Sequence, residues 1–500
     1  MYLLGFDVGT SSVKASLINA ATGVCAASDY FPKQEMRMTA VKTGWAEQDP
    51  ELWWQNLCMA SASILANSGV DRDQVRAIGI SYQMHGLVMI DKNYKVLRPS
   101  IIWCDSRAVG YGEAAARALG DEICHNHLLN SPGNFTASKL AWVKEHEPEI
   151  YSKIYKVMLP GDYIAMRMTG EVQTTIPGLS EGIIWDFKRE DISKELMRYY
   201  GFDSSIMPDV VPTFSKQAGL SADGAFALGL TPGTPVCYRA GDQANNALSL
   251  NVFKPGEVAS TAGTSGVIYG VLDKLTHDAQ NRVNLFAHVN HTVQDPRLGM
   301  LLCINGTGSM NAWIKKQISP EGISYDVMNM MADAIPIGSN GVSILPFGNG
   351  AERVLGNRDI GATFRGLNFN VHTRAHILRA VQEGIVFAMK YGLDIMSELG
   401  LNLTAIRAGA ANLYKSDIFS KTMASLAGVP IDLYETNGAA GAAKGAGIGA
   451  GIYADSDEAF AKLQKMDTIE PDVQNIEAYQ EAYLRWKELL NEVLSYSQGK

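Results

Sequence analysis

The sequence predicts an α/β protein of two domains. At 500 residues, the chain is too long for a single hydrophobic core. Short apolar segments alternate with amphipathic ones along it, as strands and helices do in α/β architectures. A Gly-Thr-Ser turn between two apolar segments occurs at residues 9–11 and again at residues 263–265. This recurrence predicts two similar halves, with a boundary at residues 246–256.

Composition and charge argue against a nucleic-acid or membrane protein. Hydrophobic residues make up 46% of the chain, and 52 acidic residues outnumber 43 basic ones, which gives a net charge of −9. No long basic run favours an anionic partner, and no apolar stretch reaches membrane-spanning length. The six cysteines lack CxxC spacing and are expected to be reduced. We therefore expect a cytoplasmic protein that binds neither nucleic acid nor membrane.

The first half opens with a hairpin that can hold phosphate. Residues 2–6 and 13–18 are predicted as buried strands, and the turn at residues 9–12 combines a glycine with three hydroxyl side chains. Small residues in such a turn leave backbone N–H groups open to anionic oxygens. Asp7 cannot bind phosphate directly, but it can hold the Mg²⁺ that accompanies phosphate. A plain hairpin with a solvated carboxylate fits this turn equally well.

The elements that follow continue the α/β pattern. Strands are predicted at residues 78–81 and 87–91, and helices at residues 50–65, 138–145 and 162–168. The helix at residue 50 has the favoured start, with Pro50 in the first turn and Asp49 as its cap.

A second start follows near residue 235. A strand over residues 236–241 runs into Asp242 and a helix over residues 243–248, and two further strands flank the turn at residues 263–265. An acidic residue at a helix start is a common cap, so the pattern alone leaves Asp242 as a cap or a site residue.

The end of the second half is rich in small residues. A strand from residue 405 runs into a turn at residues 409–412, where binding of a flat ring and a plain helix start are equally favoured. A helix over residues 438–449 is also built of small residues, and close packing is the favoured explanation there. Further elements are predicted as helices at residues 416–426 and 476–496 and a strand at residues 429–433.

The common nucleotide-binding motifs do not occur in this sequence. There is no GxxxxGK[ST], no GxGxxG after a strand, and no protein-kinase HRD and DFG pair. A nucleotide would therefore be held by hairpin turns.

Motifs in a fixed order make the sequence similar to the FGGY carbohydrate kinases. They are Gly-Phe-Asp-Val-Gly-Thr at residues 5–10, Gln-Met-His-Gly at 83–86, Trp-Cys-Asp-Ser-Arg at 103–107, Gly-Asp-Gln at 241–243 and Gly-Thr-Ser-Gly at 263–266. Residues 135–142 and 362–383 resemble the two family signatures, with Gln382 where an apolar residue is usual. The resemblance covers residues 2–450. Within the family, Gln-Met-His-Gly is typical of members that act on xylulose, and Glu-Gln-Asp-Pro at 47–50 agrees with them.

The resemblance implies two ribonuclease-H-like domains, of the actin and hexokinase type, around a central cleft. Residues 1–246 would hold the sugar site and the first phosphate turn, and residues 256–450 the second turn and the nucleotide site. Residues 451–500 would form a helical extension. The implied reaction is Mg²⁺- and ATP-dependent phosphorylation of D-xylulose at its 5-hydroxyl, and a homodimer is an allowed assembly.

The resemblance also assigns roles to single residues. Asp242 would be the general base and Asp7 the Mg²⁺ ligand. The residues expected to bind the nucleotide and its phosphates are Gly9, Thr10, Ser11, Gly263, Thr264, Gly409, Ala410 and Asn412. Those expected to contact the sugar are Gln83, Met84, His85, Trp103, Asp242 and Gln243. Asp105 and Arg107 are equally expected as ligands or as a structural ion pair, and Phe135 as a pocket or a core residue.

Two segments depart from the family pattern. The family's Gly-Gly-Gly before the adenine turn is Ala408-Gly409-Ala410 here, where two methyl groups are expected to weaken nucleotide binding or change its pose. Residues 175–180 replace Asp-x-Ser-x-Ala, with an expected effect on packing or pentulose preference.

Other functions stay open at this point. They are a kinase for ribulose, gluconate or glycerol, a non-catalytic sugar-binding regulator, and an actin-like ATPase.

Overall fold

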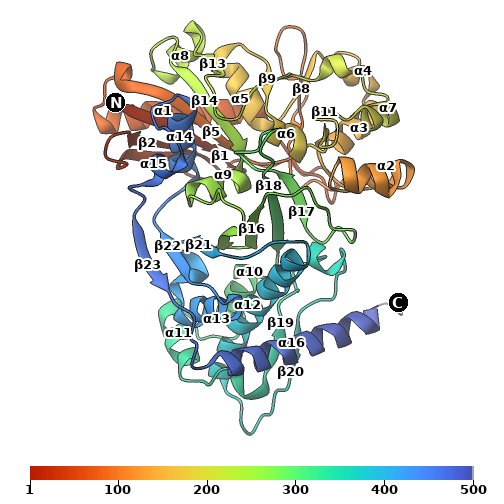
Figure 1. Ribbon diagram of the computed structural model, residues 1–500, viewed down its shortest axis with the longest axis vertical. Helices are drawn as coiled ribbons and strands as arrows, with labels where there is room; N and C mark the ends of the chain where they lie inside the picture. The colour runs from red at the N-terminus through yellow and green to blue at the C-terminus, as the bar shows by residue number, and fades with distance from the viewer. Residues whose placement is uncertain (498–500) are drawn as a thin grey trace.

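The computed structural model describes residues 1–497, which form two large sheets covered by helices (Figure 1). The first sheet has the strand order β13-β14-β5-β1-β2-β3. The bounds of these strands are Ala218–Gly219, Pro235–Gly241, Val75–Tyr82, Tyr2–Val8, Val13–Asn19 and Cys25–Phe31. The second sheet has the order β17-β18-β16-β15-β21-β22-β23. Its strands are Asn284–Ala287, Leu298–Ile304, Gly266–Leu272, Glu257–Ala262, Ala405–Gly409, Ile431–Tyr434 and Lys465–Ile469.

The two sheets share one strand pattern. In the first, β3, β2 and β1 are antiparallel neighbours, and β5 and β14 continue from β1 in parallel. In the second, β18, β16 and β15 are antiparallel neighbours, and β21 and β22 continue from β15 in parallel. The two similar halves expected from the Gly-Thr-Ser turns are therefore present as two five-stranded units of the same topology, as the predicted ribonuclease-H-like fold requires.

Helices cover both faces of each sheet. The principal helices of the first half are α1 (Pro50–Ser68), α2 (Val109–Asp121), α3 (Thr136–His146), α5 (Pro160–Thr169), α6 (Ile176–Glu181), α7 (Lys194–Tyr200), α8 (Ala222–Leu228) and α9 (Asp242–Ser249). Those of the second half are α10 (Gly308–Gln317), α11 (Tyr325–Asp333), α12 (Arg374–Glu398), α13 (Asp417–Ala427), α14 (Gly438–Gly449), α15 (Ser456–Phe460) and α16 (Ile476–Ser497). Helix α1 starts as predicted, because the Asp49 side chain accepts a hydrogen bond from the Glu51 amide at 3.0 Å.

Short elements complete the chain. Helix α4 spans Pro148–Tyr151. The remaining short strands pair into two-stranded sheets. These are β4 (Glu47–Gln48) with β7 (Ser100–Ile101), β6 (Val88–Ile90) with β8 (Lys156–Met158), β9 (Gln173–Thr174) with β12 (Asp209–Val210), β10 (Trp185–Asp186) with β11 (Asp191–Ile192), and β19 (Ser343–Leu345) with β20 (Thr363–Arg365).

Side chains of β1 alternate between the two faces of the first sheet. Leu4, Phe6 and Val8 are fully buried in a cluster with the apolar face of α1. Gly5 and Asp7 lie on the opposite face, because successive strand residues point to opposite sides. Asp7 and Gly5 therefore face the same helical layer.

That layer is α14, which packs closely on the first sheet although it lies between two strands of the second sheet in sequence (Figure 1). A Cβ atom added to Gly5 would lie 1.9 Å from the Ala439 carbonyl oxygen, and one added to Gly79 would lie 1.9 Å from that of Ala442. The approach is possible only because both strand residues are glycine. Close packing, the favoured explanation for this small-residue helix, is what the structure shows.

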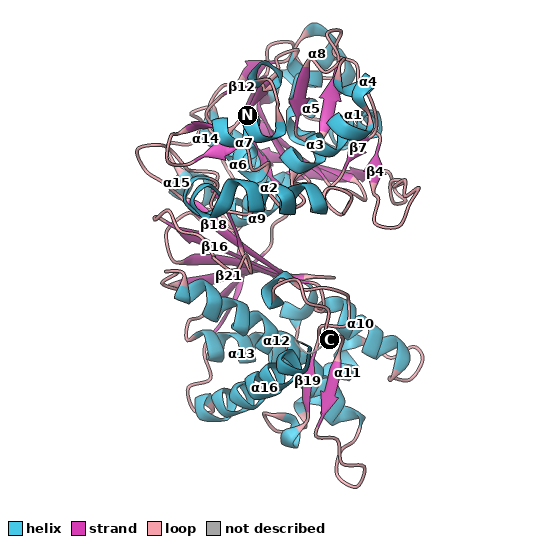
Figure 2. Ribbon diagram, turned by 90° about the vertical axis from the view of Figure 1, so that its right-hand side faces the viewer, coloured by secondary structure: helices cyan, strands magenta, loops and turns pink. Residues whose placement is uncertain are grey.

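Near the predicted boundary at residue 450, the packing of the helices does not follow their order along the chain. The chain returns to the first sheet with α14 and α15, and then pairs β23 with β22 at the edge of the second sheet. Helix α16 packs against α12, α13 and β19, so the residues expected as a helical extension are part of the second unit (Figure 2). Local periodicity defines helices but carries no information on which sheet a helix covers.

Two further properties concern the environment of the chain. Among the helices of residues 1–497, none combines the length and the apolarity that spanning a bilayer requires. All six cysteines, which lie within these residues, are unpaired.

Candidate active site

Asp7 and Asp242 lie at the same edge of the first sheet. Asp7 pairs in register with Ser81 of β5, and Ser81 pairs with Ala240 of β14, two residues before Asp242. The Ser81 hydroxyl donates to Asp7 Oδ1 at 2.8 Å, and the Lys14 ammonium lies 3.9 Å from Asp7 Oδ2. Helix α14 also begins here, since a Cβ added to Gly438 would lie 2.7 Å from Asp7 Oδ2.

The carboxyl group of Asp242 has a raised pKa. Burial raises it to about 7, and the negative charge of Asp7 adds to the rise, while hydrogen bonds from Gln243 oppose it. Gly241 occupies the cap position of α9 and Asp242 is the first helical residue, so the cap explanation of Asp242 does not describe this helix start. A carboxylate with this pKa is suited to accept a proton at neutral pH.

The turn after β1 is fixed by its neighbours. The Thr10 hydroxyl donates to Gln83 Oε1 at 3.2 Å and accepts from the Trp103 indole N–H at 2.9 Å, and the Thr10 carbonyl accepts from Gln48 Nε2 at 2.7 Å. The backbone N–H groups of Thr10 and Ser11 donate to no other described residue. The amides of the turn, rather than its first hydroxyl, are thus available to an anion.

Gln83 and Trp103, which are predicted as sugar contacts, both support this turn. Gln83 is 1% exposed and bridges Thr10 to Gln48, which in turn accepts from the Trp53 indole. Trp103 donates its only N–H to Thr10 but stays 54% exposed, which leaves its ring face accessible.

The second turn borders a pocket of about 630 Å³. The amides of Gly308 and Ser309 donate to the carbonyls of Gly263 and Thr264 at 3.0 Å each, so the start of α10 holds the turn in place. The pocket brings the turn together with Asn412, which was predicted from a distant part of the sequence. Other residues that line it include Asn311, Lys315, Ser324, Tyr325, Asn329 and Lys415.

Glu352 supports this turn and was not found from the sequence. Its fully buried carboxyl group accepts hydrogen bonds from the amides of Asn305 and Gly306 at 2.9–3.2 Å, directly before the start of α10. Burial raises its pKa to about 7.

The residues that replace Gly-Gly-Gly, Ala408, Gly409 and Ala410, lie outside the lining of this pocket. The methyl group of Ala408 is fully buried in the core, and Ala410 packs beside that core. A Cβ added to Gly409 would meet no atom within 4 Å. None of these three residues lines the pocket, in contrast to Asn412.

The Gln-Met-His-Gly loop follows β5 and lies beside Asp242. Met84 Cγ would lie 2.6 Å from a Cβ added to Gly241, the residue before Asp242. His85 Nδ1 lies 2.9 Å from the carbonyl oxygen of Glu181, and its ring packs edge-on against Phe135 with centroids 4.7 Å apart. Phe135 is thus part of this site as well as of the core.

His85 is a neutral hydrogen-bond acceptor in this setting. Burial lowers its pKa to about 3, and the charge of the buried Lys139 adds to the decrease. Because a carbonyl oxygen only accepts, Nδ1 carries the proton and donates to Glu181. Nε2 is then unprotonated, and it makes no hydrogen bond to another described residue.

Residues that the sequence analysis missed complete this region. Phe286 of β17 lies 5.4 Å from the His85 ring, and Arg353 lies 5.9 Å from the Phe135 ring, so the second half contributes to the surroundings of the loop. Glu181 is 2% exposed and touches His85. A strand edge from the other half gives no local signal in the sequence.

Asp105 and Arg107 form a structural ion pair. The Arg107 guanidinium bonds both Asp105 oxygens at 2.6–3.0 Å, and it lies 3.8 Å from the Trp45 ring centroid. Both side chains are at most 1% exposed. Of the two roles left open for these residues, the structure shows the ion pair.

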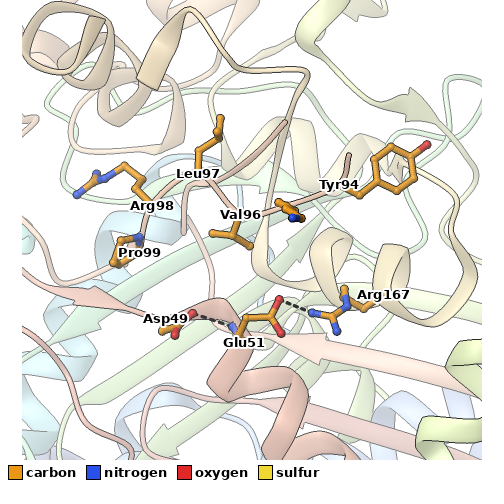
Figure 3. Close-up of a pocket in the computed structure, with 9 residues that line it drawn as sticks. Asp49, Glu51, Tyr94, Val96, Leu97, Arg98, Pro99 and Arg167 are labelled. Carbon is orange, nitrogen blue, oxygen red and sulfur yellow. Dashed lines mark hydrogen bonds and ion pairs between the residues drawn. The ribbon is translucent and has the colours of Figure 1, made fainter. Parts of the chain in front are cut away.

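A second pocket, of about 550 Å³, lies at the start of α1 (Figure 3). It contains the ion pair between Glu51 and Arg167, and Asp49, Tyr94 and Arg98 lie around it. No residue of the predicted sugar or nucleotide site lines it.

Comparison with known proteins agrees with this geometry. Models of the FGGY family of carbohydrate kinases match residues 2–249 with the N-terminal domain and residues 258–452 with the C-terminal domain. The chain is 30% identical to a xylulose kinase of Bacillus subtilis (strain 168), over 98% of this chain and 96% of that protein. It is 29% identical to a xylulose kinase of Escherichia coli (strain K12), over 99% of both. The crystal structure of xylulose kinase from Rhodospirillum rubrum has a TM-score of 0.89 and 26% identity, with 99% of both chains covered.

Proposed function

Because the chain belongs to the FGGY family of carbohydrate kinases, we propose that it transfers a phosphoryl group from ATP to the 5-hydroxyl of D-xylulose. The observation that carries this proposal is the contact between the Gln-Met-His-Gly loop and the start of α9. There, Met84 packs against Gly241, the residue before Asp242, and the carboxyl group of Asp242 has a pKa of about 7. The relatives named xylulose kinase support the choice of sugar.

In this mechanism, Asp242 accepts the proton of the 5-hydroxyl as the new bond from that oxygen to the γ-phosphorus forms, while the bond from the γ-phosphorus to the β–γ bridging oxygen breaks and ADP leaves. Phosphoryl transfer needs little covalent assistance, so positioning and charge stabilisation supply most of the rate. His85 Nε2 accepts a hydrogen bond from another sugar hydroxyl, and Met84 provides an apolar wall. Gln243 lies next to the base in sequence, where it can touch the sugar.

The two Gly-Thr-Ser turns hold the phosphates of ATP. The amides of Thr10 and Ser11 approach from the first half, and the turn at Gly263 and Thr264 approaches from the second. The pocket of about 630 Å³ beside Thr264 holds the rest of the nucleotide, with Asn412 on its wall, and Gly409 and Ala410 lie at and directly after the end of the strand that leads to it.

We also propose Mg²⁺ as the accompanying metal. Asp7 fits it, because an oxygen donor at a strand end suits a hard cation that keeps several waters and takes further ligands from phosphate. When bound, Mg²⁺ neutralises charge on the phosphates. The hydrogen bond from Ser81 and the nearby Lys14 orient the Asp7 carboxylate for this role.

A cytoplasmic location is part of the proposal, since unpaired cysteines suit a reducing compartment. A homodimer stays a prediction.

The alternatives differ at these same residues. A kinase for ribulose, gluconate or glycerol would carry a different loop at residues 83–86. A non-catalytic regulator would not need the base Asp242, and an actin-like ATPase would not need the sugar loop.

A sugar panel in a coupled ADP-release assay tests the substrate. We expect the highest kcat/KM on D-xylulose, with D-ribulose, gluconate and glycerol as the other acceptors. A higher kcat/KM on one of those three would identify that acceptor, and not D-xylulose, as the preferred substrate. ADP release that is independent of every sugar would point to an ATPase.

A further inference from the structure

Glu181, at the end of α6, lies between the two residues that define the sugar end of the site. On one side its Oε1 accepts from the His85 amide at 3.3 Å, and its own carbonyl accepts from His85 Nδ1. On the other side, a Cβ added to Gly241 would lie 2.3 Å from Glu181 Oε2. The carboxyl group is therefore packed directly against the residue that precedes Asp242.

Among the described residues, no ion pair involves this carboxyl group, and the buried guanidinium groups of Arg107 and Arg239 pair with Glu47 and Asp162. The buried ammonium of Lys139 donates to the carbonyls of His85 and Ile102 at 2.8 and 3.0 Å, and His85 is neutral. The other charged groups that act on Glu181 are the carboxylates Asp242 and Asp162, which are of like charge. A carboxylate at this position would be uncompensated, so the protonated form is favoured.

The direction of the pKa agrees with this geometry. Burial raises the pKa of Glu181 well above its usual range, and Asp242 and Asp162 add to the rise, against the hydrogen bond from His85 and the charge of Lys139. Oε1 accepts from an amide and is thus the carbonyl oxygen of the acid. Oε2 then carries the proton, and it makes no hydrogen bond to another described residue.

We propose that Glu181 is a sugar-binding residue whose Oε2–H donates a hydrogen bond to a substrate oxygen next to the one that Asp242 deprotonates. Oε2 has no partner among the described residues but is not sealed from solvent, so a sugar oxygen that replaces water there can accept its hydrogen bond. Glu181 and His85 then form a pair of opposite hydrogen-bonding character, a donor and an acceptor held together by two hydrogen bonds. The inference rests on the proposed sugar-kinase function, and it adds a specificity-determining residue directly after the segment at residues 175–180 that departs from the family pattern.

Glu181→Gln and Glu181→Leu distinguish a neutral donor from a charged or merely structural side chain. Gln keeps an acceptor at Oε1 and a donor in place of Oε2–H, so we expect a sugar KM within about three-fold of the wild type. Leu has similar size and no donor, and we expect its sugar KM to rise about ten-fold or more with the ATP KM unchanged. Glu171→Gln, at an exposed glutamate, is the control for loss of a surface carboxylate.

A deoxygenated sugar series adds a readout that a structural role would not move. Removing the sugar oxygen that accepts from Glu181 should raise the sugar KM of the wild type about as much as Glu181→Leu does. The same removal should raise the sugar KM of the Leu variant little further. Glu181→Met replaces the Leu variant if that one does not fold.

Three outcomes would overturn the assignment. They are a Gln variant as impaired as Leu, a Leu or Met variant with unchanged sugar KM, or equal deoxy-sugar losses in wild type and variant. The sugar used is the best acceptor from the panel, so a preference for another sugar changes the proposed substrate and leaves this test intact.

Discussion

Asp242→Ala lowers kcat by about 10³-fold or more while the affinity for D-xylulose changes only a few-fold. General base catalysis contributes about 10²–10⁴-fold to the rate, and the substitution also removes the group that orients the 5-hydroxyl. Sugar affinity is largely kept because Met84 and His85 lie on a separate loop. Coupled ADP release gives kcat, and titration calorimetry with D-xylulose gives the affinity. Asp223→Ala is the matched control, since Asp223 is an exposed acidic residue in the first turn of α8.

The same carboxyl group sets the pH dependence. Because its pKa is about 7, kcat/KM should fall about ten-fold per pH unit below that value, where the base is protonated. A raised pKa means that the folded state binds this proton more tightly than the unfolded state, in which the value is near 3.8. The bound proton therefore stabilises the folded protein fully below pH 3.8, and this contribution to the free energy of unfolding is lost as the pH rises through 7. Asp242→Asn, which cannot ionise, should therefore melt at a higher temperature than the wild type at pH 8. Full residual activity of Asp242→Ala, or a flat wild-type profile between pH 5.5 and 8, would remove Asp242 from this role.

Gly79→Ala destabilises the protein by about 3 kcal/mol or more, which corresponds to a fall in Tm of at least about 6 °C. The added Cβ would lie 1.9 Å from the Ala442 carbonyl oxygen and 2.6 Å from its carbon, so the backbone of α14 must move. Thermal unfolding followed by circular dichroism measures the effect. Because α14 begins above Asp7, activity should fall with stability.

Gly110→Ala is the control for this experiment, because a Cβ there meets no atom within 4 Å and the residue is helical. We expect its Tm to be unchanged or slightly raised. A Gly79→Ala variant with wild-type Tm would show that α14 does not depend on this close approach.

Much of the fold follows from local sequence signals. The strands on either side of the first turn, the capped start of α1 and the small-residue helix at residues 438–449 all lie where apolar patterns and caps predict them. The placement of α14 on the first sheet could not be predicted, because that choice depends on Gly5 and Gly79, which lie more than 350 residues away. Strand order likewise depends on pairing between distant segments.

The site residues also divide into those with a local signal in the sequence and those that only the fold reveals. Glycine, hydroxyl and carboxylate residues at strand ends make Asp7, Asp242 and the two turns candidates, and the family resemblance assigns their roles. Gln83 was predicted as a sugar contact, but its partner Gln48 comes from another segment, and only the fold shows that both support Thr10. Glu181 belongs to no sequence motif, and its proposed role as a protonated hydrogen-bond donor follows from its burial between His85 and Gly241.

Phosphorus NMR of the product is the most direct measurement of the central claim. D-xylulose, ATP and Mg²⁺ are incubated with the purified protein, and the products are observed without a coupling enzyme. We expect one equivalent of ADP for each phosphate ester, with the ester phosphorus coupled to the two C5 protons of xylulose. An ester phosphorus coupled to the C1 protons, or ADP with inorganic phosphate and no ester, would contradict the account.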